Sequence, residues 1–142
     1  MQKPRSRRGM LVALGTATAV GLAGCLELES DREVVGMTAV DYVPETVTIA
    51  VGETVVWENT SSRRHTVTAS SQDALPEGAE FFASGGYDSY EEAEDAWLDE
   101  FGGQIDTDET YSHTFEIPGT YPYVCIPHLD GGMTGTVVVE DE

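Results

Sequence analysis

The chain has 142 residues, of which 26 are acidic and 7 basic, and its formal net charge is −19. This length suits one domain, and so acidic a surface repels nucleic-acid phosphates and anionic membrane surfaces, which excludes a nucleic-acid partner. A hydrophobic fraction of 40% argues against a disordered chain.

The charge is distributed unevenly along the sequence. Residues 1–24 hold four of the basic residues and no acidic one, whereas the rest of the chain has three arginines, no lysine and all 26 acidic residues, a formal charge of −23. Molar salt screens repulsion between such charges beyond about 3 Å. We therefore expect a protein adapted to high salt, a halophile's protein.

The first 24 residues are organised like an export signal. A basic start precedes an apolar run over residues 10–23, which is short for a membrane span. SRRGML at residues 6–11 resembles a twin-arginine signal, and LAGC at residues 22–25 resembles a lipobox, whose cleavage would leave Cys25 lipidated. We expect an extracytoplasmic domain anchored to the cell membrane at Cys25. The alternative is an uncleaved N-terminal anchor.

Residues 25–33 are predicted to form a charged tether ahead of one domain at residues 34–142. Because Cys25 belongs to the processing signal, Cys125 would be a lone thiol in an oxidising compartment rather than half of a disulfide. Such a thiol is exposed to oxidation unless it is used. Metal ligation is one such use.

The domain is predicted to be all-β. Val47, Ile49 and Val51 alternate with smaller or polar residues, the period of a half-buried strand. About seven short strands with turn residues between them indicate a two-sheet antiparallel Greek-key sandwich. The segments that carry the strand pattern are residues 34–44, 45–59, 65–70, 109–117, 120–125 and 134–140.

Residues 70–108 interrupt the strand pattern, and one short helix is predicted within this central excursion. Ser89 can cap the helix, and Glu92 three residues later completes a capping box. Gly102-Gly103 would end it. The apolar face that we expect to pack against the sandwich consists of Ala93, Ala96, Trp97 and Phe101.

CIPHLDGGM, residues 125–133, combines a thiol, an imidazole and a thioether. Cys125, His128 and Met133 are a soft ligand set that favours copper, because thiolate and thioether suit Cu(I) and imidazole suits copper in general. Zinc sites usually show paired cysteine or histidine motifs, which this sequence lacks. A loop this short can wrap one ion.

Two histidines are candidates for a fourth ligand. His65 follows a polar turn, at an end of the sandwich where a second loop could meet the first. His113 lies in phase with Tyr111, Phe115 and Ile117, so we expect it to point inward and to form a hydrogen bond at the edge of the core. We therefore choose His65. A supporting role for His113 behind a metal ligand stays open.

GTYPYVCIPHLDGGMTGTVVVE, at the C-terminal end, resembles the plastocyanins and the haloarchaeal halocyanins, which are small blue copper proteins with a cupredoxin fold. The spacing Cys-x2-His-x4-Met is that family's metal loop, and GETVVWENTSSRRHTV places His65 at its separate copper histidine. The resemblance runs from about residue 38 to 140. It implies one copper ion, with His65, Cys125 and His128 in a plane and Met133 as the axial ligand.

Three departures from plant plastocyanins bear on the site. Val124 stands where they carry a tyrosine linked to a second electron route, which puts that route in doubt. Thr66 replaces an asparagine that braces the site, so either its hydroxyl braces the loops or the bracing is absent. Arg63 and Arg64 bring positive charge toward the metal, which would raise the reduction potential.

A site with four protein ligands has no open position for a substrate, so we expect a one-electron carrier cycling between Cu(I) and Cu(II), not an enzyme. The alternative is an extracytoplasmic copper carrier or scavenger, which the absence of a methionine or histidine cluster disfavours. The resemblance implies that His128 reaches the surface within an apolar patch and passes the electron. Part of such a patch would come from Pro127, Leu129, Gly131 and Gly132, joined by Val43-Pro44 if that turn lies nearby. We expect a monomer that docks transiently on membrane-bound redox proteins.

Overall fold

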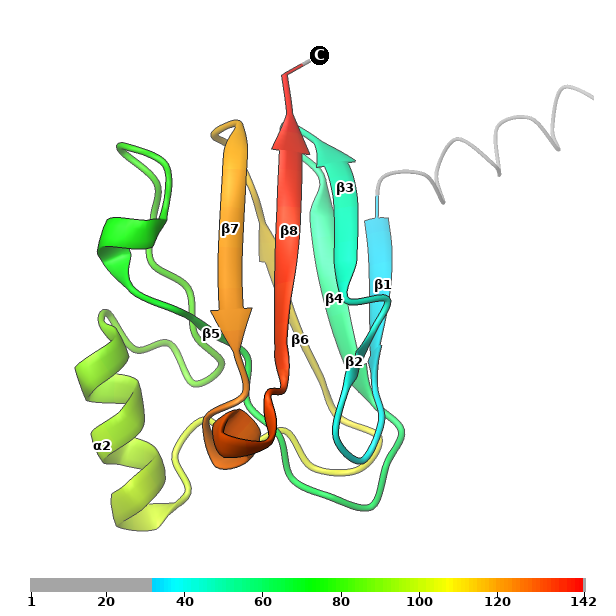
Figure 1. The fold of residues 1–142 in the computed structure, drawn as a ribbon, viewed down its shortest axis with the longest axis vertical. Helices are drawn as coiled ribbons and strands as arrows, with labels where there is room; N and C mark the ends of the chain where they lie inside the picture. Colours follow the sequence, from blue (N-terminus) through cyan, green and yellow to red (C-terminus); the bar gives the residue numbers. More distant parts are fainter. Residues whose placement is uncertain (1–31, 142) are drawn as a thin grey trace, which may run out of the picture. The chain divides into compact units, whose positions relative to one another are not determined.

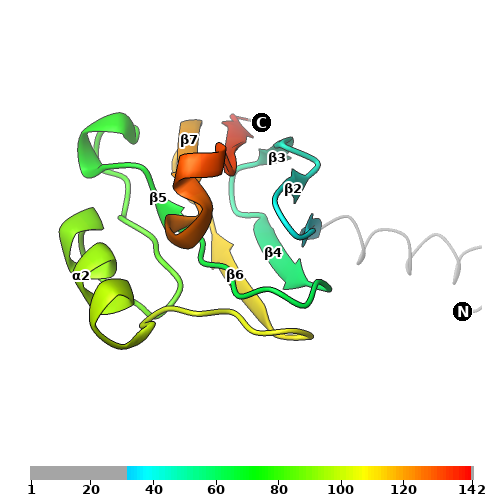
Figure 2. The same cartoon turned by 60° about the horizontal axis from the view of Figure 1, so that its bottom comes forward.

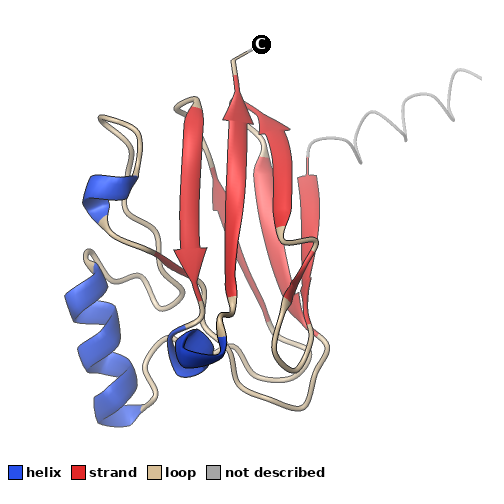
Figure 3. Cartoon of the chain, viewed as in Figure 1, coloured by secondary structure: helices blue, strands red, loops and turns tan. Residues whose placement is uncertain are grey.

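Two four-stranded sheets pack face to face in the computed structural model, which describes residues 32–141 (Figures 1 and 3). One sheet has the order β2-β1-β4-β6 and the other β3-β8-β7-β5. The strands are β1 (Arg32–Met37), β2 (Tyr42–Val43), β3 (Thr46–Ala50), β4 (Thr54–Asn59), β5 (Thr68–Ala69), β6 (Thr110–Thr114), β7 (Gly119–Val124) and β8 (Thr134–Glu140).

The predicted signal segment, Cys25 and residues 25–31 of the predicted tether lie outside the described residues. Strand β1 begins at Arg32, so the last two residues of that tether are part of the sheet. Among the described residues, no helix has the length and apolar character needed to cross a membrane.

The prediction of a mainly β, two-sheet fold with one short helix is confirmed, but the sheets are not purely antiparallel. Strand β1 runs parallel to β4, and β3 runs parallel to β8. The physical reason is connectivity. Between β1 and β4 the chain crosses to the other sheet as β3, and such a crossover allows two strands to point the same way. Alternation in a sequence indicates which face of a strand is buried, but it does not indicate which strand pairs with it or in which direction that strand runs.

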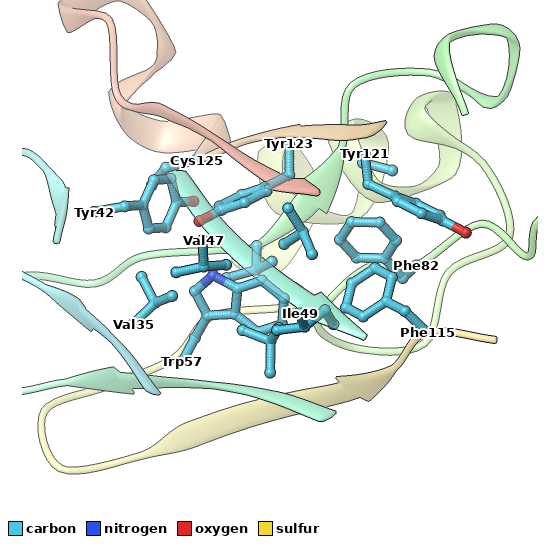
Figure 4. Close-up of a cluster of buried hydrophobic side chains, with 14 of the residues drawn as sticks. Val35, Tyr42, Val47, Ile49, Trp57, Phe82, Phe115, Tyr121, Tyr123 and Cys125 are labelled. Carbon is cyan, nitrogen blue, oxygen red and sulfur yellow. The ribbon is translucent and has the colours of Figure 1, made fainter. Parts of the chain in front are cut away.

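The core forms where the inward faces of the two sheets meet (Figure 4). Val47 and Ile49 of β3 are buried as predicted, but Val51 is exposed because the strand ends at Ala50 and the chain turns at Gly52. Each fully buried aliphatic or aromatic side chain contributes about 1.5–3 kcal/mol. The alternating pattern therefore accounts for much of the packing between the sheets.

An aromatic cluster extends this core toward Cys125 (Figure 4). The fully buried ring of Trp57 stacks on Phe82 with centroids 6.2 Å apart and meets Tyr123 edge-on at 5.3 Å. Tyr123 in turn meets Tyr42 at 4.7 Å. Edge-to-face and offset contacts of this kind add about 0.5–1.5 kcal/mol per pair. The cluster therefore forms a rigid layer of packed rings in the core at the end of the sandwich that carries Cys125.

Helix α2 (Tyr90–Glu100) occupies the predicted position beside the sandwich, with the short turn η1 (Gln72–Ala74) before it in the excursion (Figure 1). Ser89 Oγ accepts the Glu92 N–H at 3.1 Å, while the Glu92 carboxylate accepts the N–H of Asp88. Phe101 ends the helix in the left-handed region with φ 61°.

The predicted apolar face of α2 is only partly buried. Ala93 is in the core, but Phe101 is 50% exposed, so its predicted place against the sandwich is wrong. Its ring packs instead on Trp97, at 5.2 Å, and beneath the guanidinium of Arg64, at 4.7 Å. The reason is that Phe101 lies beyond the last helical residue, where the left-handed turn redirects the side chain.

We predict that the metal-free protein loses thermal stability as salt falls from molar to millimolar. Three arginines oppose 26 acidic residues after Cys25, and the described residues contain a single ion pair, Arg64–Asp106 at 3.7 Å. Removing the screening should lower Tm by at least about 10 °C, which a loss of roughly 2–3 kcal/mol produces in a domain of this size.

Calorimetry across a salt series measures this shift. Replacing exposed Glu91, Asp95 and Asp99 of α2 by their amides should reduce the salt dependence. A Tm that is independent of salt would contradict the proposed role of charge repulsion.

Candidate metal centre

The loop between β7 and β8 carries three of the four predicted ligands. It contains the helical turn η2 (Ile126–Gly131), shown in orange near the middle of one end of the sandwich in Figure 2. The N–H of Cys125 donates to the carbonyl of Met133 at 3.0 Å, and the N–H of Met133 donates to that of His128 at 3.3 Å. These bonds close the loop into a compact ring of backbone.

The reversal at the end of this loop depends on glycine. Gly132 has φ 85°, a conformation that side chains with a Cβ rarely adopt, and its N–H donates to the carbonyl of Leu129 at 2.9 Å. The chain can then return so that Met133 is buried, only 1% exposed, directly before β8. The reversal at Gly132 thus places Met133 at the start of β8 and beside the rest of the loop.

His65 lies in the connection between β4 and β5. The predicted strand at residues 65–70 is reduced to Thr68–Ala69, and His65 is held instead by an isolated bridge to Ile105. Its N–H donates to the Ile105 carbonyl at 3.3 Å, and the Ile105 N–H donates back at 2.8 Å. Ile105 belongs to the end of the excursion, so that segment positions a candidate ligand.

The two loops bring three donor side chains together. The ligand atoms of His65, Cys125 and His128 all lie within 4.8 Å of one another. Cys125 Sγ is 3.5 Å from Nδ1 of His65 and 3.4 Å from Nδ1 of His128. Cys125 and His65 are fully buried, whereas His128 is half-buried. One ion could therefore contact two imidazoles and a thiolate.

His113 lies apart from this group. Its ring stacks on Phe82 with centroids 5.0 Å apart and meets Phe115 edge-on at 4.8 Å, so it points inward as predicted. The hydrogen bonds of the described residues include none from its side chain, and in this respect the prediction is wrong. The half-buried ring packs between Phe82 and Phe115, and this burial lowers the pKa of His113 against an opposing effect of Glu80, which favours a neutral ring that can pack without a charged partner.

The hydroxyl of Thr66 braces the two loops. The N–H of Ile126 donates to Thr66 Oγ1 at 2.8 Å, and the N–H of Thr66 points at Cys125 Sγ at 3.5 Å. The hydroxyl of Tyr42, in the aromatic cluster, donates to the Thr66 carbonyl at 2.6 Å. Of the two possibilities that the sequence left for Thr66, the bracing one is confirmed.

The environment prepares the two imidazoles for ligation. Burial lowers the pKa of His65 to about 4, with a further decrease from repulsion by His128 and Arg63 that the Thr38 backbone partly opposes. Burial, followed by Arg63, also lowers the pKa of His128. Both rings are therefore neutral at pH 7, the form that binds metals.

The pKa of the Cys125 thiol is shifted so that, unlike the two imidazoles, this group is protonated in the metal-free protein. Burial raises the pKa of Cys125, against hydrogen bonds from Thr66 and His128 that stabilise the thiolate. The thiol therefore keeps its proton until a metal displaces it. A buried thiolate, two neutral imidazoles and a neighbouring thioether form the donor set that suits copper.

Some groups that shape the site were missed in the sequence. Ser61 Oγ lies 3.1 Å from Nε2 of His65, and the buried side chain of Asn59 accepts a hydrogen bond from Ser61. Both residues belong to ENTSSRR, which the sequence shows only as a polar turn. Of the two arginines there, Arg64 has its charge engaged by Asp106, so Arg63 supplies the positive charge felt by the histidines.

Comparison with known proteins finds a match between residues 32–140 and the family described as copper binding proteins, plastocyanin/azurin family. Plastocyanin of Scenedesmus fuscus is 36% identical over 102 residues, covering 72% of this chain and 89% of that protein. Amicyanin-alpha of Methylorubrum extorquens is 31% identical over 133 residues, covering 91% of this chain and 92% of that protein. The chain spans 60% of two longer chloroplastic plastocyanins.

Among solved structures, amicyanin from Paracoccus versutus is similar, with a TM-score of 0.55 and 30% identity, covering 78% of this chain and 82% of that one. Variants of amicyanin that are also similar have been solved in oxidised and Cu(I) forms. The family match, over residues 32–140, spans both sheets and both loops.

We predict that binding of Cu(I) at pH 7 releases about one proton per chain. The proton comes from Cys125, whose pKa is raised, while His65 and His128, whose pKa values are lowered, are already unprotonated. Calorimetric titration in buffers of different ionisation enthalpy counts the protons. Cys125→Ser should reduce the count to zero. Release of two or three protons would mean that the histidines are charged before binding, contrary to their burial.

Proposed function

Since the chain belongs to the plastocyanin/azurin family of copper-binding proteins, we propose that it carries single electrons through one copper ion held by His65, Cys125, His128 and Met133. It is a blue copper electron carrier and not an enzyme, like the plastocyanins and amicyanins that it resembles. The particular ligand set, the location and the partners are the parts of this function that we propose.

The observation that carries the proposed ligand set is the convergence on Cys125. Its sulfur faces Nδ1 of both His65 and His128, at 3.5 and 3.4 Å, although His65 lies 60 residues away in the sequence. Met133 is buried at the end of the same loop, and its backbone bonds to Cys125 and His128 keep it beside them. A copper ion in such a site supplies an exchange between Cu(I) and Cu(II).

The exchange would be fast because the protein keeps the donor atoms in place when the ion changes oxidation state. Thr66 and the backbone bonds of the η2 loop hold the donor atoms, and the aromatic cluster beneath them resists displacement. Only His128 among the three converging residues reaches solvent. Leu129, the next residue, is 38% exposed and provides apolar surface beside His128. We propose that the electron leaves through His128.

A role as copper carrier or scavenger is the weaker candidate. Cys125 and His65 are fully buried, and a delivery protein needs ligands that a recipient can reach. Burial of this kind slows exchange of the ion, whereas it leaves electron transfer through His128 unaffected. The geometry therefore favours a resident ion.

We also propose that the domain works outside the cytoplasm, tethered to the cell membrane by a lipid on Cys25. The support is the order of signals in the sequence, with RR at residues 7–8, the apolar run and LAGC at residues 22–25. Its redox partners would then be membrane-bound proteins that dock transiently on the monomer.

The ligand set is tested by optical spectroscopy of the copper-loaded protein. We expect an intense thiolate-to-Cu(II) absorption band that reductant bleaches reversibly, and Cys125→Ser should abolish it. His65→Ala should weaken copper binding. Met133→Leu should keep the band and raise the reduction potential, since loss of the thioether weakens the hold on Cu(II).

His113→Ala is the matched control for His65→Ala. Its imidazole is partly buried outside the group of donors, so its removal should leave the spectrum unchanged. If His113→Ala bleaches the protein and His65→Ala does not, the proposed fourth ligand is wrong.

The anchor is tested by fractionation of cells that produce the full chain. Cys25→Ser should release the protein from membranes or stall its processing, with no change in the copper spectrum of purified material. Replacement of Arg7 and Arg8 by lysine should block export. Mature wild-type protein that is soluble and unmodified at Cys25 would contradict the lipid anchor.

A further inference from the structure

The polar turn before His65 contains a buried amide whose orientation is fixed by its neighbours. Asn59 has no exposed surface, and its Nδ2 lies 2.7 Å from the carbonyl of Arg63 and 2.8 Å from that of Ile105. Carbonyl oxygens only accept, so the nitrogen of the amide must face them. Oδ1 therefore faces Ser61, whose N–H and hydroxyl lie at 2.9 and 2.7 Å.

This orientation determines where the hydroxyl proton of Ser61 goes. A hydroxyl has one proton, and the shortest contact of Ser61 Oγ is with Asn59 Oδ1, an obligate acceptor at 2.7 Å. The lone pairs of Ser61 Oγ are then left for donors. The Arg63 carbonyl, at 3.3 Å, is a second and more distant acceptor for the same proton, so the proton goes to an obligate acceptor in either case. The N–H of Arg63, at 3.2 Å, donates to the Ser61 oxygen, and the remaining group in reach is Nε2 of His65 at 3.1 Å.

We propose that Asn59 and Ser61 are positioning residues that set the tautomer of His65, with the proton on Nε2 and the lone pair of Nδ1 facing Cys125. Because the hydroxyl proton of Ser61 is committed to Asn59, its oxygen can only accept from Nε2–H. A neutral imidazole carries one proton, so Nδ1 is unprotonated where it meets Cys125 Sγ at 3.5 Å.

The inference rests on the proposed role of His65 as a copper ligand, since the tautomer matters only if Nδ1 binds the ion. A hydrogen bond on the other ring nitrogen orients a metal-binding imidazole and increases its basicity.

His128 provides an internal comparison. Its Nδ1 also faces Cys125 Sγ, at 3.4 Å, but the hydrogen bonds of the described residues include none at its Nε2, and its ring is half-exposed. The hydrogen bonds of Asn59 and Ser61 therefore set the tautomer of His65 and not that of His128. The buried ligand is held by the protein, while the ligand at the surface is left to solvent or to a partner.

The test begins with the metal-free protein, so that its outcome is independent of electron transfer. Long-range proton–nitrogen NMR spectra distinguish the two neutral tautomers of each histidine. We expect wild-type His65 to be in the Nε2–H form almost completely. In Ser61→Ala the Nδ1–H form should become populated, while Ser61→Thr, which keeps the hydroxyl, should restore the wild-type tautomer.

The second measurement is the affinity for Cu(II) and for Cu(I), determined with competing chelators. Without the acceptor for Nε2–H, His65 is a weaker donor, and the more strongly polarising Cu(II) loses more affinity than Cu(I). We expect Ser61→Ala to lower the ratio of Cu(II) to Cu(I) affinity about tenfold, which raises the reduction potential by about 59 mV. Ser62→Ala, on the exposed neighbouring serine, is the matched control and should change neither value.

Three results would overturn the proposal. Wild-type His65 could carry its proton on Nδ1, and this result alone would exclude a role of Asn59 and Ser61 in setting the tautomer. The Nε2–H form could persist in Ser61→Ala, which would show that another acceptor, such as the Thr38 backbone, holds the proton. The affinity ratio could change equally in Ser61→Thr and Ser61→Ala, which would make the effect one of packing. Loss of the blue band with an intact Nε2–H tautomer would instead reject the proposed copper role.

Discussion

The contact between the His65 loop and the thiol of Cys125 is the constraint on which the site depends. The His65 loop follows β4 of one sheet, and Cys125 follows β7 of the other. Thr66 joins them, since its N–H points at Cys125 Sγ and its hydroxyl accepts the N–H of Ile126. The distances among the three donor side chains are therefore fixed by the packing of the two sheets.

The aromatic cluster makes the packing of the two sheets rigid at the end that carries the His65 loop and Cys125. Tyr42 links it directly to the site, because its ring meets Tyr123 in the core while its hydroxyl donates to the Thr66 carbonyl. Displacing the loop would require moving buried rings in a close-packed interior. A metal centre held in this way can change oxidation state with little rearrangement, which is the property that an electron carrier needs.

Charge and polarity are organised differently at the surface and at the site. Among the residues that the structure describes, the acidic side chains are exposed or half-buried, including those of α2, whereas the loop of His65 carries two of the three arginines after Cys25. Arg64 is engaged with Asp106 and Phe101. In concentrated salt long-range attraction is screened, so the docking that we propose would depend on apolar contact around His128.

The sequence by itself determined the features that depend on short spacing. Alternation in β3, the Ser89–Glu92 cap of α2 and the Cys-x2-His-x4-Met loop are each encoded within a few residues. The polar turn before His65 favoured it over His113 as the fourth ligand, and resemblance to a known family agreed with that choice. Only the tertiary structure decided the parallel pairing of β1 with β4, the exposure of Phe101, the bridge from Ile105 to His65 and the bonds of Asn59 and Ser61. These depend on which distant segments meet, and the spacing of residues along one segment carries no information about its neighbours in space.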